Sequence, residues 1–276
     1  MTVQIITDSG SDLTPALASA YGVTVVPLQV LLGGVNYRDG VDLSPAEFYA
    51  QMRRAKELPK TSQPVPQELI AAYRAAVERG PVLSIHLSAN LSGTFQTATM
   101  AARTVSDSIW VFDSRSGSGG LALQVLEAAR LAREGASVET IIATLEMRRT
   151  EIHTLVALST LENAVKGGRV SPVAGMAASL LGVKPIVHVT RDGRVEPIDR
   201  VRGRGRALER LLEMAAKLRT EWTDRPVVVA HGNCREDAEA FARSVRERFA
   251  PGELMILPIG ATVGTYAAEG AILFSF

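Results

Sequence analysis

The sequence predicts an α/β fold with two domains: an N-terminal α/β/α domain with a parallel sheet, and a C-terminal α/β domain with a mixed sheet. In the first half, short β-branched runs alternate with longer helical patterns, which is typical of βαβ units. In the second half, two extended runs are joined by residues 190–194, where the Asp192-Gly193 step is a strong hairpin signal. Because the pattern changes near residue 160, we expect domains at residues 1–160 and 161–276.

The expected strands of the first half are residues 3–7, 23–31, 82–87, 109–112 and 154–158. Between them, apolar residues recur at three- and four-residue spacing, as at Leu69, Tyr73 and Ala76, and this period predicts helices. Helix starts are marked by Ser44-Pro45 and by Ser137, where a capping hydroxyl precedes helix-forming residues. This half therefore predicts a parallel sheet covered on both faces.

The second half predicts two strands at residues 183–189 and 195–201, joined by the hairpin. A long helix over about residues 205–222 follows, then a strand at 226–230, a helix at 235–249, and strands near 254–258 and 270–276. A hairpin-linked strand pair combined with helices indicates a mixed sheet.

Composition excludes several classes of function. The 276 residues are 46% hydrophobic, which is enough for substantial cores. The 30 basic and 29 acidic residues give a net charge of +1, and aromatic residues make up only 5%. A general nucleic-acid binder is usually more basic and uses aromatic stacking, so we expect no nucleic-acid partner.

The sequence also predicts a cytoplasmic protein. The single cysteine, Cys234, has no partner for an internal disulfide and fits a reducing compartment. The N-terminus leads directly into a strand, without the basic run and apolar core of a signal peptide. No apolar run reaches the roughly 18 residues of a membrane span.

Two loops rich in hydroxyl groups lie about thirty residues apart. One is Lys60-Thr61-Ser62-Gln63-Pro64, and the other is Leu91-Ser92-Gly93-Thr94-Phe95-Gln96. Each lies beside an expected helix start, where free N–H groups and the helix dipole favour an anion. Neither contains a histidine, cysteine or carboxylate that could act as a base or metal ligand. Hydroxyl groups without an activating base are suited to holding a ligand rather than cleaving it.

Enzymatic and metal sites find little support. No Gly-x-Ser-x-Gly nucleophile elbow, Walker loop or zinc-like His/Cys pair occurs, so neither ATP nor a metal is expected. His86 and His188 lie in apolar strands and are expected to be structural. Cys234 is expected to be a small apolar loop residue rather than a reactive thiol.

Asp8 and Asp113 each follow an expected strand as part of an Asp-Ser pair. Carboxyl ends of parallel strands border the binding crevice of an open sheet, which would place both residues near a site. We favour a structural interpretation, in which each caps the next turn.

Further segments occur in a characteristic order: Thr7-Asp8-Ser9-Gly10-Ser11-Asp12-Leu13, the two hydroxyl-rich loops, Leu161-Glu162-Asn163, Lys166-Gly167-Gly168-Arg169-Val170, Lys184-Pro185 and Gly264-Thr265. Taken together, they resemble the DegV family, bacterial fatty-acid-binding proteins that serve as FakB subunits of fatty acid kinase. Each motif alone is weak, but their order and spacing over about 260 residues argue against a chance match.

The resemblance implies a lipid tunnel between the two domains. It implies a long-chain fatty acid of the palmitate, stearate or oleate type as ligand, with no other cofactor. It also implies that the protein is a lipid-binding subunit rather than an enzyme, presenting the carboxylate to a separate ATP-dependent kinase that makes acyl phosphate for phospholipid synthesis. A transient contact with the membrane surface stays open. Carried over by motif, the carboxylate-binding candidates are Thr61, Ser62, Ser92, Gly93, Thr94 and Thr265.

The energetics of lipid binding are consistent with a long-chain fatty acid as the ligand. Burying about 14 methylenes at roughly 0.8 kcal/mol each supplies on the order of 11 kcal/mol, part of which is lost to entropy. A carboxylate buried without partners costs several kcal/mol, so it requires two or three donors.

The chain departs from the family pattern at Tyr266. The family usually has a histidine there, followed by Gly-Pro-Gly, whereas this chain has Tyr266-Ala267-Ala268-Glu269-Gly270. Tyr266 is a further carboxylate-binding candidate, because a phenol can donate one hydrogen bond to a carboxylate, but it supplies no positive charge near pH 7. The rival interpretation is a substrate-binding subunit for a sugar phosphate or dihydroxyacetone, which would hold its substrate through a histidine.

Basic residues alternate from Arg200 to Arg206. They form either a solvated edge, a docking patch for an acidic kinase partner, centred on Arg202 and Arg204, or a contact for DNA. The resemblance adds Arg169 to the docking candidates. For the tunnel wall, Met176, Leu180 and Leu181 are candidates, with ordinary inter-domain packing as the alternative.

Overall fold

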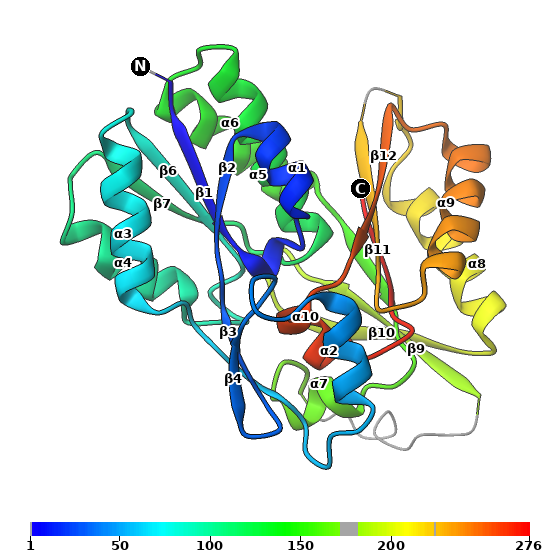
Figure 1. Cartoon of the computed structure of the whole chain (residues 1–276). Helices are drawn as coiled ribbons and strands as arrows, with labels where there is room; N and C mark the ends of the chain where they lie inside the picture. The colour runs from blue at the N-terminus through cyan, green and yellow to red at the C-terminus, as the bar shows by residue number, and fades with distance from the viewer. Residues whose placement is uncertain (1, 172–181, 224) are drawn as a thin grey trace.

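The computed structural model describes residues 2–171, 182–223 and 225–276, and contains three β-sheets (Figure 1). The first sheet has four parallel strands in the order β2-β1-β6-β7. These strands are β1 (Gln4–Asp8), β2 (Val23–Val26), β6 (Val82–His86) and β7 (Ile109–Asp113). Their carboxyl ends meet at one edge, as expected for a sheet built from βαβ units.

Helices cover both faces of this sheet, which confirms the α/β/α arrangement (Figure 1). One face packs against α3 (Pro66–Val77) and α4 (Thr94–Arg103). The other packs against α1 (Pro15–Tyr21) and α5 (Gly119–Arg133), with α6 (Val138–Glu151) behind α5. The predicted cap at Ser137 is confirmed, because its hydroxyl accepts from the Thr140 N–H.

The second sheet is mixed, in the order β10-β9-β8-β13-β11-β12, with only β11 and β12 parallel. Its strands are β8 (Thr154–Ala157), β9 (Val183–Val189), β10 (Val195–Arg202), β11 (Pro226–His231), β12 (Glu253–Pro258) and β13 (Ile272–Ser275). The hairpin between β9 and β10 is confirmed. The expectation that β8 extends the first sheet is wrong, because β8 pairs with β13 and β9.

Helices α8 (Arg204–Leu218) and α9 (Arg235–Phe249) cover the outer face of the second sheet. The inner face packs against α5, which therefore lies between the two large sheets (Figure 1). The largest apolar core of the described residues occupies part of this space, with side chains from both sheets meeting those of α5. The division of the chain at residue 160 stays a prediction. No helix in the described ranges is long and apolar enough to cross a membrane.

A third, antiparallel sheet was not predicted. Its order is β4-β3-β5, with β3 (Gln29–Leu32), β4 (Val35–Arg38) and β5 (Lys60–Ser62). The single strand expected over residues 23–31 is split, because Pro27 lies between β2 and β3 and has no N–H for a ladder. Helix α2 (Pro45–Met52) begins directly after Ser44, and a capping box formed by Ser44 and Glu47 confirms the predicted start.

The C-terminal segment reaches back to this third sheet. Helix α10 (Ala261–Ala267) contacts α2, β3 and β5, and also α7 (Glu162–Lys166). It also contacts the 3₁₀ turn η1 (Ser9–Ser11) that follows β1. Elements from both ends of the chain are thus brought together where the site lies.

Candidate functional site

A cavity of about 690 Å³ lies at the carboxyl ends of β6 and β7, between the two large sheets. This volume is within the range of small-molecule and lipid sites, roughly 300–1,000 Å³. The loops after β6 and β7 supply Leu87, Leu91, Ser92, Gly117 and Ser118 to its wall. The expectation that a crevice borders the carboxyl ends of the parallel strands is therefore confirmed.

The side of the cavity formed by the second sheet is apolar. Leu273 of β13, Val156 of β8 and Val187 of β9 line it, and they are paired in register across three neighbouring strands. Val189 and Val195, paired across the hairpin, continue this wall. Side chains at every second residue of a strand point to one face, so the register produces a continuous apolar surface.

The β9–β10 hairpin is attached to the first sheet. The Ser88 hydroxyl donates to the Gly193 carbonyl at 2.8 Å, and the Asn90 side chain donates to the Asp192 carbonyl at 2.6 Å. Gly193 has φ +80°, and a Cβ there would approach Ser88 Oγ to 2.2 Å. Only glycine fits this left-handed, closely packed turn, which fixes the hairpin beside the cavity.

Hydroxyl groups from β5, α10 and the start of α4 line another part of the cavity, which we call the hydroxyl end. Thr61 Oγ1 and the Tyr266 phenol lie 2.6 Å apart, and the Ser92 and Thr94 hydroxyls are joined at 2.8 Å. Thr61, Ser62, Ser92 and Tyr266 all line the cavity. In a pair of hydroxyls one proton joins the two oxygens, and the second remains free to donate to a ligand.

Two residues at the end of α7, Gly167 and Arg169, pack against the Tyr266 ring. The Arg169 guanidinium lies over its ring at 4.5 Å, and Arg169 Nη1 donates to the Gly167 carbonyl at 2.6 Å. A Cβ on Gly167 would lie only 2.3 Å from Tyr266 Cε1, so the ring fits there because residue 167 has no side chain. Arg169 itself lines the cavity, and it brings to the site the positive charge that the phenol lacks.

The remaining predicted ligand-binding residues are placed differently. Gly93 lines the cavity at the start of α4. Thr94 is fully buried and supports Ser92 from behind, through the hydroxyl pair and through its own N–H. Thr265 is also fully buried, and its hydroxyl donates to the Ala261 carbonyl of the same helix at 2.8 Å, so it does not line the cavity wall.

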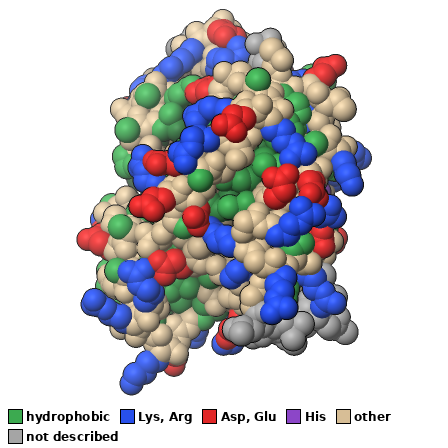
Figure 2. Space-filling model, turned by 90° about the vertical axis from the view of Figure 1, so that its right-hand side faces the viewer, with side chains coloured by type: hydrophobic (Ala, Val, Ile, Leu, Met, Phe, Trp, Pro, Cys, Tyr) green, Lys and Arg blue, Asp and Glu red, His purple; other side chains and the backbone are tan. Residues whose placement is uncertain are grey.

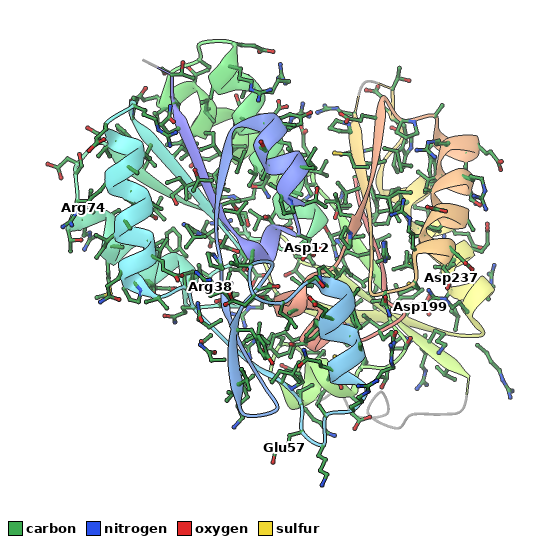
Figure 3. The ribbon with its side chains drawn as sticks, in the orientation of Figure 1. Asp12, Arg38, Glu57, Arg74, Asp199 and Asp237 are labelled. Atoms are coloured by element: carbon green, nitrogen blue, oxygen red, sulfur yellow. The ribbon has the colours of Figure 1, made fainter. Side chains whose placement is uncertain are left out.

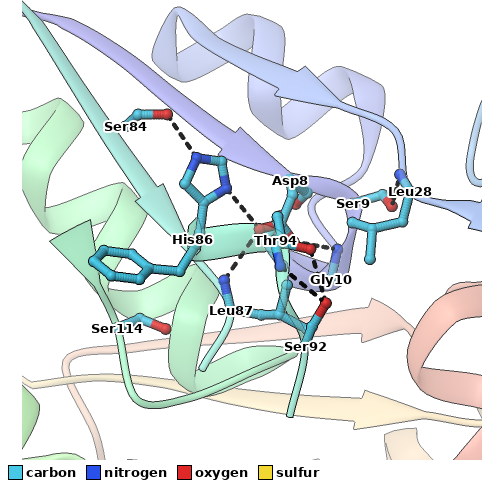
Figure 4. Close-up of polar contacts among 12 residues, drawn as sticks. Asp8, Ser9, Gly10, Leu28, Ser84, His86, Leu87, Ser92, Thr94 and Ser114 are labelled. Carbon is cyan, nitrogen blue, oxygen red and sulfur yellow. Dashed lines mark hydrogen bonds and ion pairs between the residues drawn. The ribbon is translucent and has the colours of Figure 1, made fainter. Parts of the chain in front are cut away.

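A buried polar network positions the loop that carries Ser92 (Figure 4). Asp8 Oδ2 bonds His86 Nδ1 at 2.9 Å and accepts the Leu87 N–H at 3.0 Å, and Asp8 Oδ1 accepts the Gly10 N–H. His86 Nε2 lies 2.7 Å from Ser84 Oγ. The structural interpretation of Asp8 and His86 is therefore confirmed. Asp113 is structural as well, since its carboxylate accepts from the Arg115 and Ala89 N–H groups.

Two buried carboxyl groups lie at the start of α10. Asp39 accepts the N–H groups of Ala261 and Thr262, and Asp12 accepts that of Gly260 at 2.8 Å. Burial raises the pKa of Asp39, and raises that of Asp12 to about 8. Asp12 lies near the centre of the molecule (Figure 3) and is largely protonated at pH 7.

The arginines proposed for docking differ in their surroundings. Arg202 is exposed at the end of β10. Arg204 bonds Asp237 at 2.6 Å and also donates to the Gly270 carbonyl and to Cys234 Sγ, so it holds the start of α8 against α9. On the face that Figure 2 shows, acidic and basic side chains are interspersed. Met176, Leu180 and Leu181 lie outside the described residues.

Comparison with known proteins fits this architecture. The family model described as "Uncharacterised protein, DegV family" matches residues 2–276. The chain belongs to the DegV family. A DegV domain-containing protein of Deinococcus radiodurans is 38% identical over 282 residues, covering 99% of this chain and 97% of that protein. The membership expected from the motifs is thus confirmed.

Solved DegV structures share the whole fold. A fatty-acid-binding DegV family protein from Thermus thermophilus is 33% identical, with a TM-score of 0.92 over 100% of this chain and 99% of that one. A stearic-acid-binding protein from Eubacterium ventriosum is 27% identical, with a TM-score of 0.90 over 99% and 97% of the two chains. Homologous structures therefore carry fatty acids. Among the described residues of the present DegV chain, no group of three or more His, Cys, Asp or Glu side chains is placed to hold a metal ion.

Sequence reasoning missed several residues of this DegV site. Gly167 was only part of a motif, and nothing in the sequence indicated that it makes room for Tyr266. Arg169 was expected on a docking surface, yet it lines the cavity. Thr262 also lines it, and its spacing of four residues from Tyr266 was a detectable signal, since such residues share one face of a helix.

Proposed function

We propose that this DegV protein binds a long-chain fatty acid in the cavity, holds the carboxylate at the hydroxyl end, and presents it to a separate ATP-dependent fatty acid kinase. The observation that carries the proposal is the two-sided cavity, with an in-register apolar wall on one side and paired hydroxyls on the other. The fatty acids bound by its relatives support the choice of ligand.

The apolar wall supplies the affinity for the tail. Each buried methylene contributes about 0.8 kcal/mol, so a chain of about 14 methylenes offers on the order of 11 kcal/mol before entropic costs. A sugar phosphate or dihydroxyacetone would leave the wall formed by Leu273, Val156 and Val187 without a complementary ligand. The cavity therefore favours a lipid over these polar substrates.

The hydroxyl end fixes the orientation of the fatty acid by binding its carboxylate. Thr61, Ser92 and Tyr266 offer neutral donors, and the Arg169 guanidinium over the phenol ring provides a favourable field for an anion. A hydrogen bond to a charged group contributes about 1.5–3 kcal/mol, so two or three such bonds offset the desolvation of a carboxylate. Ser62, which is exposed at the same end, places this end near the surface.

In the proposed reaction the carboxylate is the nucleophile and the kinase supplies ATP, so acyl phosphate and ADP form without a catalytic residue from this chain. For docking we propose the surface that includes Arg202. Arg202→Glu should slow acyl phosphate formation at least fivefold without weakening fatty acid binding. Lys217→Glu is the matched control, since it reverses an exposed charge near the other end of α8, about 20 Å along the helix.

The binding proposal is tested by the ligand that the protein carries. Protein purified from its own host is extracted with organic solvent, and the extract is analysed by mass spectrometry. A stoichiometric long-chain fatty acid supports the proposal. A polar phosphate or triose at that stoichiometry, or failure of the delipidated protein to bind added stearate, would overturn it.

A further inference from the structure

The cavity contains a second polar region, which adjoins the hydroxyl end because Gln29 pairs with Ser62 across β3 and β5. Gln29, Ser118 and Thr262 line it and are 6%, 1% and 4% exposed. Each has one polar atom with no hydrogen-bond partner among the described residues: Gln29 Nε2, Ser118 Oγ and Thr262 Oγ1. The hydroxyls at the carboxylate end differ, because Thr61 and Ser92 already have partners.

These three side chains come from separate elements, and their backbones are fixed. Gln29 lies on β3, and its Oε1 accepts from the Asn36 side chain at 2.8 Å, so its amide N–H₂ is turned the other way. Ser118 precedes the first turn of the 15-residue helix α5, and its N–H donates to the Gly10 carbonyl at 2.6 Å. Its φ of +50° is unusual for a residue with a side chain.

Thr262 lies one helical turn before Tyr266 on α10, so both face the cavity. Asp39 lies behind Thr262 and accepts its N–H, and Asp12 lies behind Ser118. Each hydroxyl also lies close to its neighbouring carboxyl group, and this contact opposes the burial that raises the carboxyl pKa, but neither hydroxyl makes a hydrogen bond of full geometry within the described residues. Both hydroxyls thus remain able to bond a group inside the cavity.

A saturated hydrocarbon chain cannot form hydrogen bonds with the polar groups of this region. Methylenes packed over Ser118 and Thr262 would keep two hydroxyls away from water without offering them a partner, which is unfavourable for each. The N-terminal end of α5 adds a partial positive charge at the same place, which favours an electron-rich atom. An oxygen along the acyl chain would satisfy these groups.

Building on the fatty acid binding proposed above, we propose that the cavity accepts acyl chains bearing an oxygen substituent, a hydroxyl or keto group, bonded by Ser118 and Thr262 with Gln29 as a further donor. The carboxylate stays at Thr61 and Tyr266, and the in-chain oxygen lies at the second polar region. The protein then discriminates among fatty acids by oxygenation as well as by length.

The test compares stearic acid with a series of hydroxystearic acids that differ in the position of the hydroxyl, each titrated into delipidated protein by calorimetry. One additional hydrogen-bonded hydroxyl is worth roughly a threefold to tenfold change in Kd. At least one isomer should bind threefold or more tightly than stearic acid. The combined variant Ser118→Ala with Thr262→Val should abolish that preference and leave stearic acid binding equal or tighter.

Thr265→Val is the matched control. It makes the same substitution on the same helix, but its hydroxyl already donates to Ala261, so the preference should survive. If stearic acid binds and every hydroxystearic isomer binds equally or more weakly, the second region holds only water and the inference is wrong. If the control variant loses the preference as fully as the combined variant, the assignment to Ser118 and Thr262 is wrong. If neither class of lipid binds, the proposed function fails as well.

Discussion

The contact between Thr61 and Tyr266 allows a sharp test of how the carboxylate is held. Tyr266→Phe removes one oxygen, and the ring should stay in place because Gly167 and Arg169 pack against it. Thr61→Val removes the other oxygen at nearly constant volume. Since the two hydroxyls are 2.6 Å apart, one can donate to the other while the second donates to the carboxylate, and they should act as a unit.

The expected magnitude follows from this geometry. A hydrogen bond to a charged group contributes about 1.5–3 kcal/mol, so each single variant should weaken stearate binding at least tenfold. Loss of either hydroxyl disrupts the same arrangement, so the double variant should lose clearly less than the product of the two single effects. Calorimetric titration of delipidated protein measures all four Kd values, and a fluorescent fatty acid displaced by stearate checks them.

Stearyl alcohol separates the carboxylate from the tail. It makes the same tail contacts without the charge, so both single variants should change its Kd much less than that of stearate. Thr265→Val should behave as wild type, because its hydroxyl is used within α10. A Tyr266→Phe protein that binds stearate within twofold of wild type would refute this arrangement of the carboxylate.

Three further outcomes follow. Gly167→Ala should weaken stearate binding about as much as Tyr266→Phe, because the added Cβ would lie 2.3 Å from Tyr266 Cε1 and must displace the ring. Calorimetry measures the change, and Gly205→Ala is the control because a Cβ at Gly205 meets no other atom within 4 Å. Val187→Phe should place a larger side chain in the cavity beside the apolar wall, so the affinity for an 18-carbon acid should fall more than that for a 12-carbon acid in direct competition. An equal loss of affinity for both acids would argue against the placement of the tail. In the wild type, the free energy of unfolding should fall by about 1.4 kcal/mol per pH unit between roughly pH 4 and 8, because Asp12 must ionise in the unfolded state but stays protonated in the folded state. Asp12→Asn should remove this pH dependence, as measured by urea unfolding. The sign follows because the unfolded carboxyl group loses its proton at a lower pH than the folded one, so raising the pH favours the unfolded state. Parallel pH profiles for the two proteins would contradict this prediction.

The sequence was most informative where local chemistry agrees with tertiary structure. The caps at Ser44 and Ser137 and the Asp192-Gly193 hairpin are local signals, and each appears as predicted. The motif segments at Thr61 and Ser92 likewise mark two parts of the cavity wall, although only Ser92 lies in a loop that follows a predicted strand, and Thr61 lies on the unpredicted strand β5.

Other features depend on long-range contacts that leave no local trace. Strand β8 looks like any buried strand, and only its pairing with β13 and β9 places it in the second sheet. The role of Gly167 arises from the ring of a residue about one hundred positions away, and Thr265 is withdrawn from the cavity by its own helix. Motif resemblance could indicate which segments meet, but not which side chains of those segments face the cavity.

The central claim is that a fatty acid occupies the cavity with its carboxylate at the hydroxyl end. A crystal structure with a fatty acid brominated at its terminal carbon tests it most directly, since the anomalous signal locates the tail. We predict bromine against Val187 and Leu273, and carboxylate oxygens within about 3 Å of the Thr61, Ser92 or Tyr266 hydroxyls. Bromine beside Thr61, or bound lipid only outside the cavity, would contradict the account.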